Sequence, residues 1–333
     1  MLRSLSIPAA TRTLVLVALA TSALISVAHG EQPPAYISTW GQYGTAPGSF
    51  NQPFDLAFMP NGNTYVSDWR NHRVQVFTHD GGFLFDWGGN GSAPGQFNEP
   101  MGLAIDRDSF VYIADRMNHR VQKFTAKGDF VTQWGSQGTG PGQFDQPTGI
   151  EVDPDGMVHV TDYLNDRVQT FTPEGTYLGE WGGTGSGPGQ FDNPVGIDFD
   201  AAGDAYVADR GNDRIEKFSA AGAYLGEWGT LGSEPGQFYN PLGVGLDAQG
   251  NVFVADHGNS RIEKFKADGT FLSTWGTLGA GPGEFDLTNS VVVDKAGLIF
   301  VADCHNHRIQ VFGYLPTAVE ALSWGQIKGQ YRP

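Results

Sequence analysis

The sequence contains a single cysteine, Cys304, so no intrachain disulfide is possible and stability must come from packing. Basic residues are also scarce: 20 Lys and Arg face 36 Asp and Glu, which gives a formal net charge of -16. A surface of that sign repels phosphate backbones, so nucleic acid is not an expected partner. The chain contains neither a GxSxG nucleophile elbow nor a GxxxxGK phosphate loop. The common hydrolase and nucleotide-binding motifs are therefore excluded.

The first 30 residues have the layout of a secretory signal peptide. A short start with Arg3 and Arg12 and no acidic residue precedes the apolar run Thr13–Val27, and Ala28 and Gly30 offer small residues at the -3 and -1 positions. The apolar run is short for a membrane span, which needs about 20 residues. We therefore expect cleavage after Gly30, a secreted or periplasmic protein, and no membrane span in the mature chain.

A repeat of 47 residues dominates the rest of the chain, and it is clearest in the pattern D-x-x-N-x-R. The aspartates of this pattern are Asp68, Asp115, Asp162, Asp209, Asp256 and Asp303. The arginines are Arg73, Arg120, Arg167, Arg214, Arg261 and Arg308. A fixed period of this length is typical of a repeat architecture.

One repeat predicts four strands, at Pro100–Asp106, Phe110–Asp115, Arg120–Phe124 and Phe130–Gly135. Short polar turns separate these strands, and a longer glycine-rich loop at residues 136–146 leads into the next repeat. No part of the repeat has helical periodicity. Four antiparallel strands in each of six repeats predict an all-β, six-bladed β-propeller over residues 31–325, with residues 326–333 as a tail.

Recurring aromatic residues support the same count. The tryptophans with this spacing are Trp40, Trp87, Trp134, Trp181, Trp228 and Trp275, and Trp324 follows 49 residues later. The phenylalanines are Phe50, Phe97, Phe144, Phe191, Phe238 and Phe285. We expect both sets to cover the joints between neighbouring blades.

Two segments compete to complete the last blade, Tyr36–Gly41 near the N-terminus and Val319–Gly325 near the C-terminus. Pairing the N-terminal segment with the C-terminal sheet would close the ring and remove its open edges. Gly313–Thr317 also interrupts the usual hairpin into the C-terminal segment. We therefore favour closure by the N-terminal strand.

The repeat resembles the NHL-repeat family of β-propellers. The matching unit is PxGLAxDxxxxVYVADxxNHRVQxF, best preserved over Met101–Phe124 and Gly196–Phe218, and the resemblance extends from Gln52 to Phe312. It implies a six-bladed propeller. The family includes protein-binding and RNA-binding modules, extracellular scaffolds and an enzyme branch, the peptidyl-hydroxyglycine amidating lyases, which are secreted propellers that use zinc and calcium.

The D-x-x-N-x-R pattern has a structural and a functional interpretation. The aspartate can accept backbone N–H groups of the following turn, the arginine can reach back to it, and the asparagine suits a left-handed turn position. Alternatively, the charged residues could form a ring of ligand-binding groups. An active site occurs once in a chain, whereas this pattern occurs six times, so we interpret it as a structural clasp.

Function is expected where the repeats differ. In a propeller the loops on one face usually carry the binding residues, and the two positions after each repeated aspartate vary strongly. The candidate ligand-binding residues there are Trp69, Arg70, Arg116, Met117, Tyr163, Arg210, His257, Cys304 and His305. They form either a binding surface or a set of freely varying solvated loop tips, and the sequence leaves both open.

A second anomaly lies near the predicted axis, where the innermost strands carry small residues. Asp55, Glu151 and Asp198 break that pattern with carboxylates. Converging carboxylates could hold Ca²⁺, or the channel could be filled with water that tolerates acids. A Zn²⁺ site usually needs three protein ligands, and His257 and His305 on adjacent blades supply only two candidates.

The resemblance to the amidating lyases adds one more feature, because Tyr163 with Arg116 or Arg210 is similar to the Tyr and Arg of those enzymes. The sequence thus predicts an exported, monomeric propeller whose loop-rich face binds a protein, peptide or carbohydrate. The alternative is a metal-dependent lyase or hydrolase with its site at the mouth of the central channel and Ca²⁺ or Zn²⁺ as cofactor.

Overall fold

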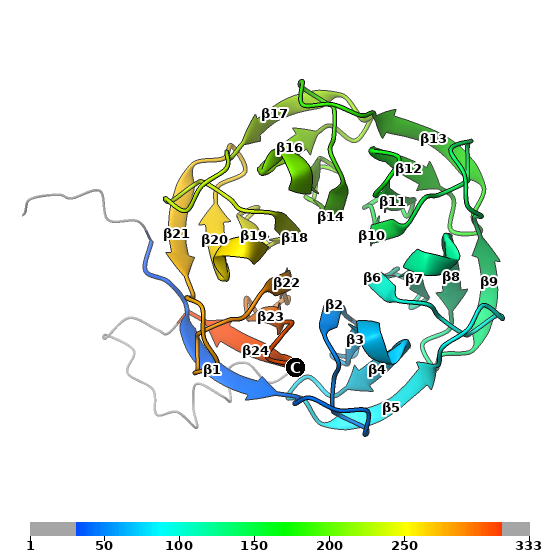
Figure 1. The fold of residues 1–333 in the computed structure, drawn as a ribbon, viewed down its shortest axis with the longest axis horizontal. Helices are drawn as coiled ribbons and strands as arrows, with labels where there is room; N and C mark the ends of the chain where they lie inside the picture. The colour runs from blue at the N-terminus through cyan, green and yellow to red at the C-terminus, as the bar shows by residue number, and fades with distance from the viewer. Residues whose placement is uncertain (1–30, 315–333) are drawn as a thin grey trace, which may run out of the picture.

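The computed structural model describes residues 31–314. The predicted signal peptide, the segment Val319–Gly325 with Trp324, and the predicted tail at residues 326–333 lie outside the described residues. Six four-stranded antiparallel sheets surround a central axis (Figure 1). The predicted all-β, six-bladed propeller is therefore confirmed. Within residues 31–314 no helix is long and apolar enough to cross a membrane.

Each blade runs outward from the axis in chain order. The innermost strands are β2 (Pro53–Phe58), β6 (Pro100–Ile105), β10 (Pro147–Val152), β14 (Pro194–Phe199), β18 (Pro241–Leu246) and β22 (Thr288–Val293). The second strands are β3 (Thr64–Asp68), β7 (Val111–Asp115), β11 (Val158–Asp162), β15 (Ala205–Asp209), β19 (Val252–Asp256) and β23 (Ile299–Asp303). The third strands are β4 (Arg73–Phe77), β8 (Arg120–Phe124), β12 (Arg167–Phe171), β16 (Arg214–Phe218), β20 (Arg261–Phe265) and β24 (Arg308–Gly313).

The outermost strand closes the ring. Five blades end with β5 (Phe83–Gly88), β9 (Phe130–Trp134), β13 (Tyr177–Gly182), β17 (Tyr224–Trp228) and β21 (Phe271–Trp275). In the sixth blade this place is taken by β1 (Ala35–Trp40), which pairs with β24 (Figure 1). Closure by the N-terminal strand is therefore confirmed. No sheet among the described residues is left with a missing strand.

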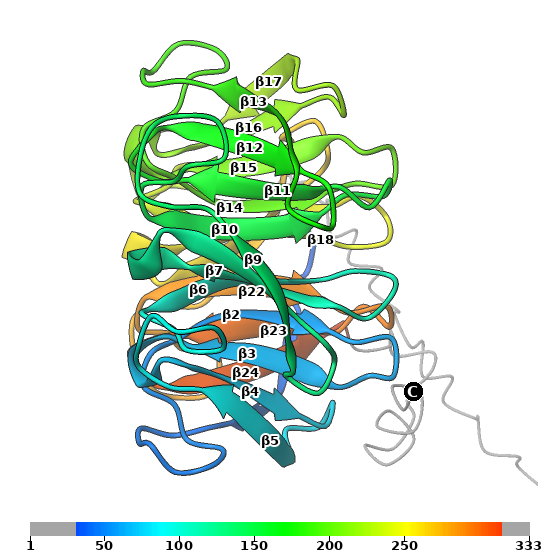
Figure 2. The ribbon, with the colours of Figure 1, turned by 90° about the vertical axis from the view of Figure 1, so that its right-hand side faces the viewer.

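The turn between the second and third strands contains the only helical elements of the described chain. These are four short 3-10 helices, η1 (Trp69–Asn71), η2 (Arg116–Asn118), η3 (Arg210–Asn212) and η4 (His257–Asn259). The sequence did not predict them because three residues are too few to show a helical period. They lie on one face of the disc, which Figure 2 shows from its side.

Aromatic residues fill the joints between blades, as predicted. Trp87 at the end of β5 packs against Phe124 of the next blade with ring centroids 5.7 Å apart, and Phe97 lies 5.5 Å from the same ring. Phe97 and Phe124 are fully buried. Gly128 passes over the indole with φ of 82°, and a Cβ there would lie 2.7 Å from Trp87, so this hairpin requires glycine.

Candidate functional site

A buried aspartate in every blade joins the loops of one face. Asp115 Oδ1 accepts a 2.7 Å hydrogen bond from the backbone N–H of Asn98, and its Oδ2 accepts bonds from Arg120 Nε (2.7 Å) and Gln122 Nε2 (3.0 Å). The Asp–Arg contact recurs in all six blades. The backbone partner lies in the glycine-rich loop, however, and not in the turn after the aspartate as we expected. The clasp therefore links two loops.

The left-handed position of this turn is not the asparagine, which corrects our expectation. Asn118 uses its amide to bond Asp115 and the carbonyl of Gly91. The next residue, His119, is left-handed with φ of 53°, and its Nδ1 accepts the backbone N–H of Gln146, 3.1 Å away in the following loop.

This contact also recurs around the ring, although the residue type changes. The other acceptors, all with φ between 52° and 54°, are His72, Asp166, Asp213, Ser260 and His307. In His72, His119 and His307 one ring nitrogen is therefore used by this contact. They are fixed in hydrogen bonds between successive repeats.

A cavity of about 320 Å³ opens on this loop-rich face, at the centre of the ring. Eight of the nine candidate ligand-binding residues line it: Trp69, Arg70, Arg116, Tyr163, Arg210, His257, Cys304 and His305. Met117 does not line the cavity, and its side chain is exposed. The residues that differ between repeats are thus brought together in space, and the repeated residues hold the loops that carry them.

A ring of six residues that the sequence reasoning missed forms the floor of this loop-side cavity. Each follows the first residue of an innermost strand: Phe54, Met101, Thr148, Val195, Leu242 and Asn289. All six are at least 90% buried. They recur every 47 residues and vary in type, so the rule that selected the loop residues could have found them too.

Glu99, also missed, organises one side of the cavity from behind the lining. Its carboxylate accepts hydrogen bonds from Trp69 Nε1 (3.1 Å), Arg70 Nη1 (2.5 Å) and Arg116 Nη1 (3.3 Å). Arg70 also lies over the Trp69 ring, with Cζ 4.0 Å from its centroid. These contacts fix three of the candidate side chains with a single negative charge.

Tyr163 lies between the side chains of Arg116 and Arg210 in the lining of the cavity. Arg210 Nη1 donates to its hydroxyl at 2.8 Å, and the Cζ of Arg116 lies 5.7 Å from its ring centroid. Asn193 Nδ2 donates to its backbone carbonyl at 3.0 Å. The tyrosine is thus held between two guanidinium groups, one at its edge and one over its face.

The histidines and the cysteine occupy different environments. Burial lowers the pKa of His257 to about 4, so the ring is neutral at pH 7, and its Nδ1 lies 3.1 Å from the carbonyl of Thr288. His305 is exposed, with Nδ1 3.5 Å from Asp286 Oδ1. Cys304 is only 2% exposed, and burial raises the pKa of its thiol to about 12. A thiolate nucleophile is therefore not formed near neutral pH.

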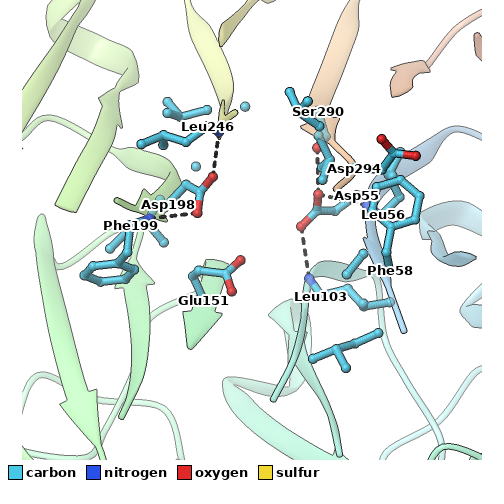
Figure 3. Close-up of a pocket in the computed structure, with 18 of the residues that line it drawn as sticks. Asp55, Leu56, Phe58, Leu103, Glu151, Asp198, Phe199, Leu246, Ser290 and Asp294 are labelled. Carbon is cyan, nitrogen blue, oxygen red and sulfur yellow. Dashed lines mark hydrogen bonds between the residues drawn. The ribbon is translucent and has the colours of Figure 1, made fainter. Parts of the chain in front are cut away.

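A second, larger cavity of about 930 Å³ follows the axis on the other side of the floor (Figure 3). The innermost strands approach each other closely around it: a Cβ added at Gly149 would lie 2.0 Å from the carbonyl oxygen of Val195. Asp55, Glu151 and Asp198 line this axial cavity. The carboxylates predicted near the axis are thus placed there.

Two of these carboxylates are anchored by backbone donors. Asp55 accepts bonds from Leu56 N (2.9 Å), Leu103 N (3.0 Å) and Ser290 Oγ (2.7 Å), which belong to three successive blades. Asp198 accepts bonds from Phe199 N (2.7 Å) and, in the next blade, Leu246 N (2.8 Å). Both carboxylates therefore link neighbouring blades through hydrogen bonds.

Glu151 differs because, within residues 31–314, only its Oε1 accepts a hydrogen bond, from Val152 N at 2.9 Å, and its carboxyl group is directed into the cavity (Figure 3). Burial, together with the charge of Asp198, raises the pKa of Glu151 well above its usual value. Burial also raises the pKa of Asp198 to about 7. The axial cavity therefore holds at least one proton near neutral pH.

The described residues do not fit a metal centre. The five candidates divide between two cavities, with His257 and His305 on the loop side and Asp55, Glu151 and Asp198 on the axial side of the buried floor. Within residues 31–314 no group of three or more His, Cys, Asp or Glu side chains is arranged to hold a metal ion. Neither the calcium nor the zinc hypothesis gains support from this geometry.

The model of the NHL repeat matches residues 50–77, 97–124, 238–265 and 289–312. Among curated proteins, the chain is 37% identical over 54 residues to the B-box type zinc finger protein ncl-1 of Caenorhabditis elegans. That match covers 16% of this chain and only 6% of the length of that relative.

Solved structures of proteins with different named activities are similar in fold to this chain. A catalytically inactive virginiamycin B lyase from Staphylococcus aureus with quinupristin has a TM-score of 0.56 and 13% identity, covering 80% of this chain and 86% of that one. A putative gluconolactonase has a TM-score of 0.62 and 15% identity, covering 86% and 97%. An auxiliary nutrient binding protein from Bacteroides thetaiotaomicron has a TM-score of 0.60 and 15% identity, covering 80% and 69%. At these identities the similarity extends to the fold alone.

Proposed function

Given that this chain is a six-bladed β-propeller of the NHL-repeat family, we propose that it is a recognition module that binds its ligand in the loop-side cavity. The main support for this proposal is that residues that differ between repeats line the same cavity. Eight side chains selected only because they differ between repeats line one cavity, whereas the repeated residues around them are spent on holding loops. Of the eight, only Arg70 and His305 are exposed, whereas residues free to vary at solvated tips would all be exposed.

The size of the cavity limits the ligand. About 320 Å³ is at the small end of ligand pockets and accommodates a small molecule, one sugar unit or the end of a peptide. Four residues of the buried floor, Phe54, Val195, Leu242 and Asn289, line both cavities and lie between them. Trp69 and Tyr163 offer aromatic surface with polar edges, which suits such ligands. A peptide or oligosaccharide would therefore insert its end and lie across the loops.

The names of the structural neighbours support a ligand-binding role without selecting a ligand. A propeller of this shape serves as a lyase in one case and as a nutrient binding protein in another. We propose that this chain is exported by residues 1–30 and acts as a monomer outside the cytoplasm. N-terminal sequencing of the mature protein and its elution volume in size-exclusion chromatography test these two points.

A fragment screen by ligand-observed NMR tests the proposed function. Neutral, acidic and basic fragments are mixed with the wild type, with Tyr163→Ala on the loop side, and with Glu151→Gln in the axial cavity. We expect the hits to disappear in Tyr163→Ala and to persist in Glu151→Gln. Hits that depend on Glu151 but not on Tyr163 would move the site to the axial cavity and refute the proposal.

The alternative function is a metal-dependent lyase or hydrolase at the channel mouth. Only the shared location of His257 and His305 favours it, since both line the loop-side cavity. Elemental analysis of the purified protein separates the two functions. Stoichiometric zinc that is lost in His257→Ala would favour the enzyme, and a metal-free folded protein would eliminate it.

A further inference from the structure

The loop-side cavity has a charge opposite to that of the protein. Its lining includes Arg70, Arg116 and Arg210 but no aspartate or glutamate. The whole chain has 36 acidic and 20 basic residues. A low-dielectric concavity with charges of one sign focuses its field on the ligand. The cavity is therefore a positive site on an acidic surface.

The protein neutralises only part of this charge. Glu99 forms ion pairs with both Arg70 and Arg116, so one carboxylate serves two guanidinium groups. Arg210 forms no ion pair within residues 31–314, and its bond to the hydroxyl of Tyr163 adds no negative charge. Two positive charges thus remain in the cavity.

Arg116 shows that this excess is built into the site. Its Nε is buried and has no hydrogen-bond partner among the described residues, and burial lowers the pKa of the guanidinium. Burying an ionised group costs free energy unless a counter-charge compensates it. Freely solvated loop tips would not hold an arginine in this way. Arg70, whose side chain is 44% exposed, lies at the rim.

The donors around Tyr163 are of the kind that bind oxyanions. Arg116 and Arg210 flank Tyr163, and a guanidinium is a planar fork that matches a carboxylate or a phosphate. Nη1 and Nη2 of Arg116 also donate to Glu99 and Gln146, whereas the guanidinium of Arg210 has only its bond to Tyr163 among the described residues. Because Arg210 donates to the tyrosine oxygen, the tyrosine hydrogen is free to donate to a ligand. Beneath these donors lies the apolar part of the floor, including Phe54, Met101 and Leu242.

We propose that the ligand of the loop-side cavity carries an oxyanion, a carboxylate or a phosphate monoester, on an apolar or aromatic body. The oxyanion binds between Arg116, Arg210 and the hydroxyl of Tyr163, and the body packs against the apolar floor. This inference rests on the proposed recognition function and deepens it, because it specifies the chemistry that the cavity selects.

Matched probes test the charge preference directly. Phenylacetate, phenyl phosphate and the neutral isostere phenylacetamide are titrated into the full-length mature protein, and binding is measured by calorimetry or ligand-observed NMR at low salt. We expect phenylacetate or phenyl phosphate to bind at least about tenfold more tightly than phenylacetamide, because a hydrogen bond to a charged group contributes about that much. The comparison of the two anions tells which headgroup is preferred.

Two variants separate a site from a general charge effect. Arg210→Met should abolish the preference for the anion, whereas Lys127→Gln removes one positive charge from an exposed turn outside the cavity and should leave it unchanged. If Arg210→Met does not fold, the comparison of acid and amide in the wild type still decides, since it needs no variant.

The outcomes distinguish this inference from the function on which it rests. Equal binding of acid and amide, both lost in Tyr163→Ala, would overturn the oxyanion assignment and leave the recognition site standing. Binding of neither probe at 10 mM would also overturn the assignment, while the broader fragment screen would judge the function separately. Tight binding of a single-stranded RNA octamer in preference to either anion would assign the arginines to a phosphate backbone and overturn the proposal as well.

Discussion

Two of the six clasps contain a substitution that should make the stability of the propeller depend on pH. In blade two, Gln122 Nε2 donates to Asp115 and its Oε1 accepts the N–H of Gly95. Blades four and five have Glu216 and Glu263 at this position. A charged glutamate offers no donor to the neighbouring carboxylate, but a protonated one places an O–H where glutamine has its N–H.

Burial raises the pKa of both glutamates to about 8, and the neighbouring carboxylates Asp209 and Asp256 add to the effect. Arg214 Nη2 lies 3.1 Å from Glu216, but burial outweighs its attraction. The glutamates are therefore largely protonated at pH 7.

The direction of the pH effect follows from these pKa values. A carboxyl group with a higher pKa in the folded chain binds its proton more strongly when folded, so its contribution to stability is complete below its unfolded pKa, near 4.5. That contribution is lost as the pH rises through about 8. Between pH 4.5 and pH 7 the loss is on the order of 3 kcal/mol for each glutamate. For a chain of this size, this corresponds to roughly 5 °C in melting temperature.

Glu216→Gln and Glu263→Gln should therefore raise the melting temperature at pH 7 and 8.5 but not at pH 4.5. The two glutamates lie in different clasps, so the effects should add in the double variant. The reciprocal variant, Gln122→Glu, should introduce the same pH dependence into blade two. Thermal and urea unfolding at the three pH values measure both. A loss of stability in Glu216→Gln at every pH, or an unchanged pH profile in the double variant, would contradict protonation of these glutamates in the folded protein.

Three further predictions concern the axis and the thiol. Glu151→Gln keeps the acceptor for Val152 and removes a carboxylate whose pKa is raised by burial. The variant should therefore stabilise the fold at pH 8 and have little effect at pH 4. Equal shifts of the melting temperature at both pH values would argue against this prediction. Gly149→Ala should destabilise by about 1–3 kcal/mol in urea unfolding, whereas Gly179→Ala, where a Cβ meets nothing within 4 Å, should be close to neutral. Cys304 should resist iodoacetamide at pH 8 in the folded protein and react on unfolding, and rapid labelling of the native protein would contradict its burial.

Repetition explains why the fold was predictable from one sequence. A pattern seen six times averages out the local noise that limits the interpretation of a single strand. The strands of the second repeat were accordingly placed within one residue of their observed bounds, for example Val111–Asp115 against the expected Phe110–Asp115. The same averaging separated clasp residues such as Asp115 from variable residues such as Arg116.

The details that failed depend on the path of the backbone. The left-handed position was assigned to Asn118 on intrinsic preference, but tertiary contacts place it at His119, whose equivalents include aspartate and serine. Because this position requires a hydrogen-bond acceptor and not one particular residue type, no single residue type recurs there in every repeat of the sequence. Glu99 was missed for a related reason, because its role depends on Arg70 and Arg116 of two different blades.

The partition between the two cavities was equally invisible in the sequence. The buried floor lies between two groups of residues, His257 and His305 on the loop side and Asp55, Glu151 and Asp198 on the axial side. From the sequence alone these two groups could not be assigned to different cavities. Only the three-dimensional ring shows which of the variable residues face one another.

The central claim is that the loop-side cavity, and not the axial one, binds the ligand. A crystal of the protein soaked with 4-bromophenylacetate tests it most directly, since the anomalous signal of bromine locates the probe without ambiguity. We expect a bromine peak against the apolar floor beside Met101, which lines only the loop-side cavity, with the carboxylate within hydrogen-bond distance of Arg210. A bromine peak in the axial cavity beside Glu151, or none in either cavity at saturating probe, would contradict it.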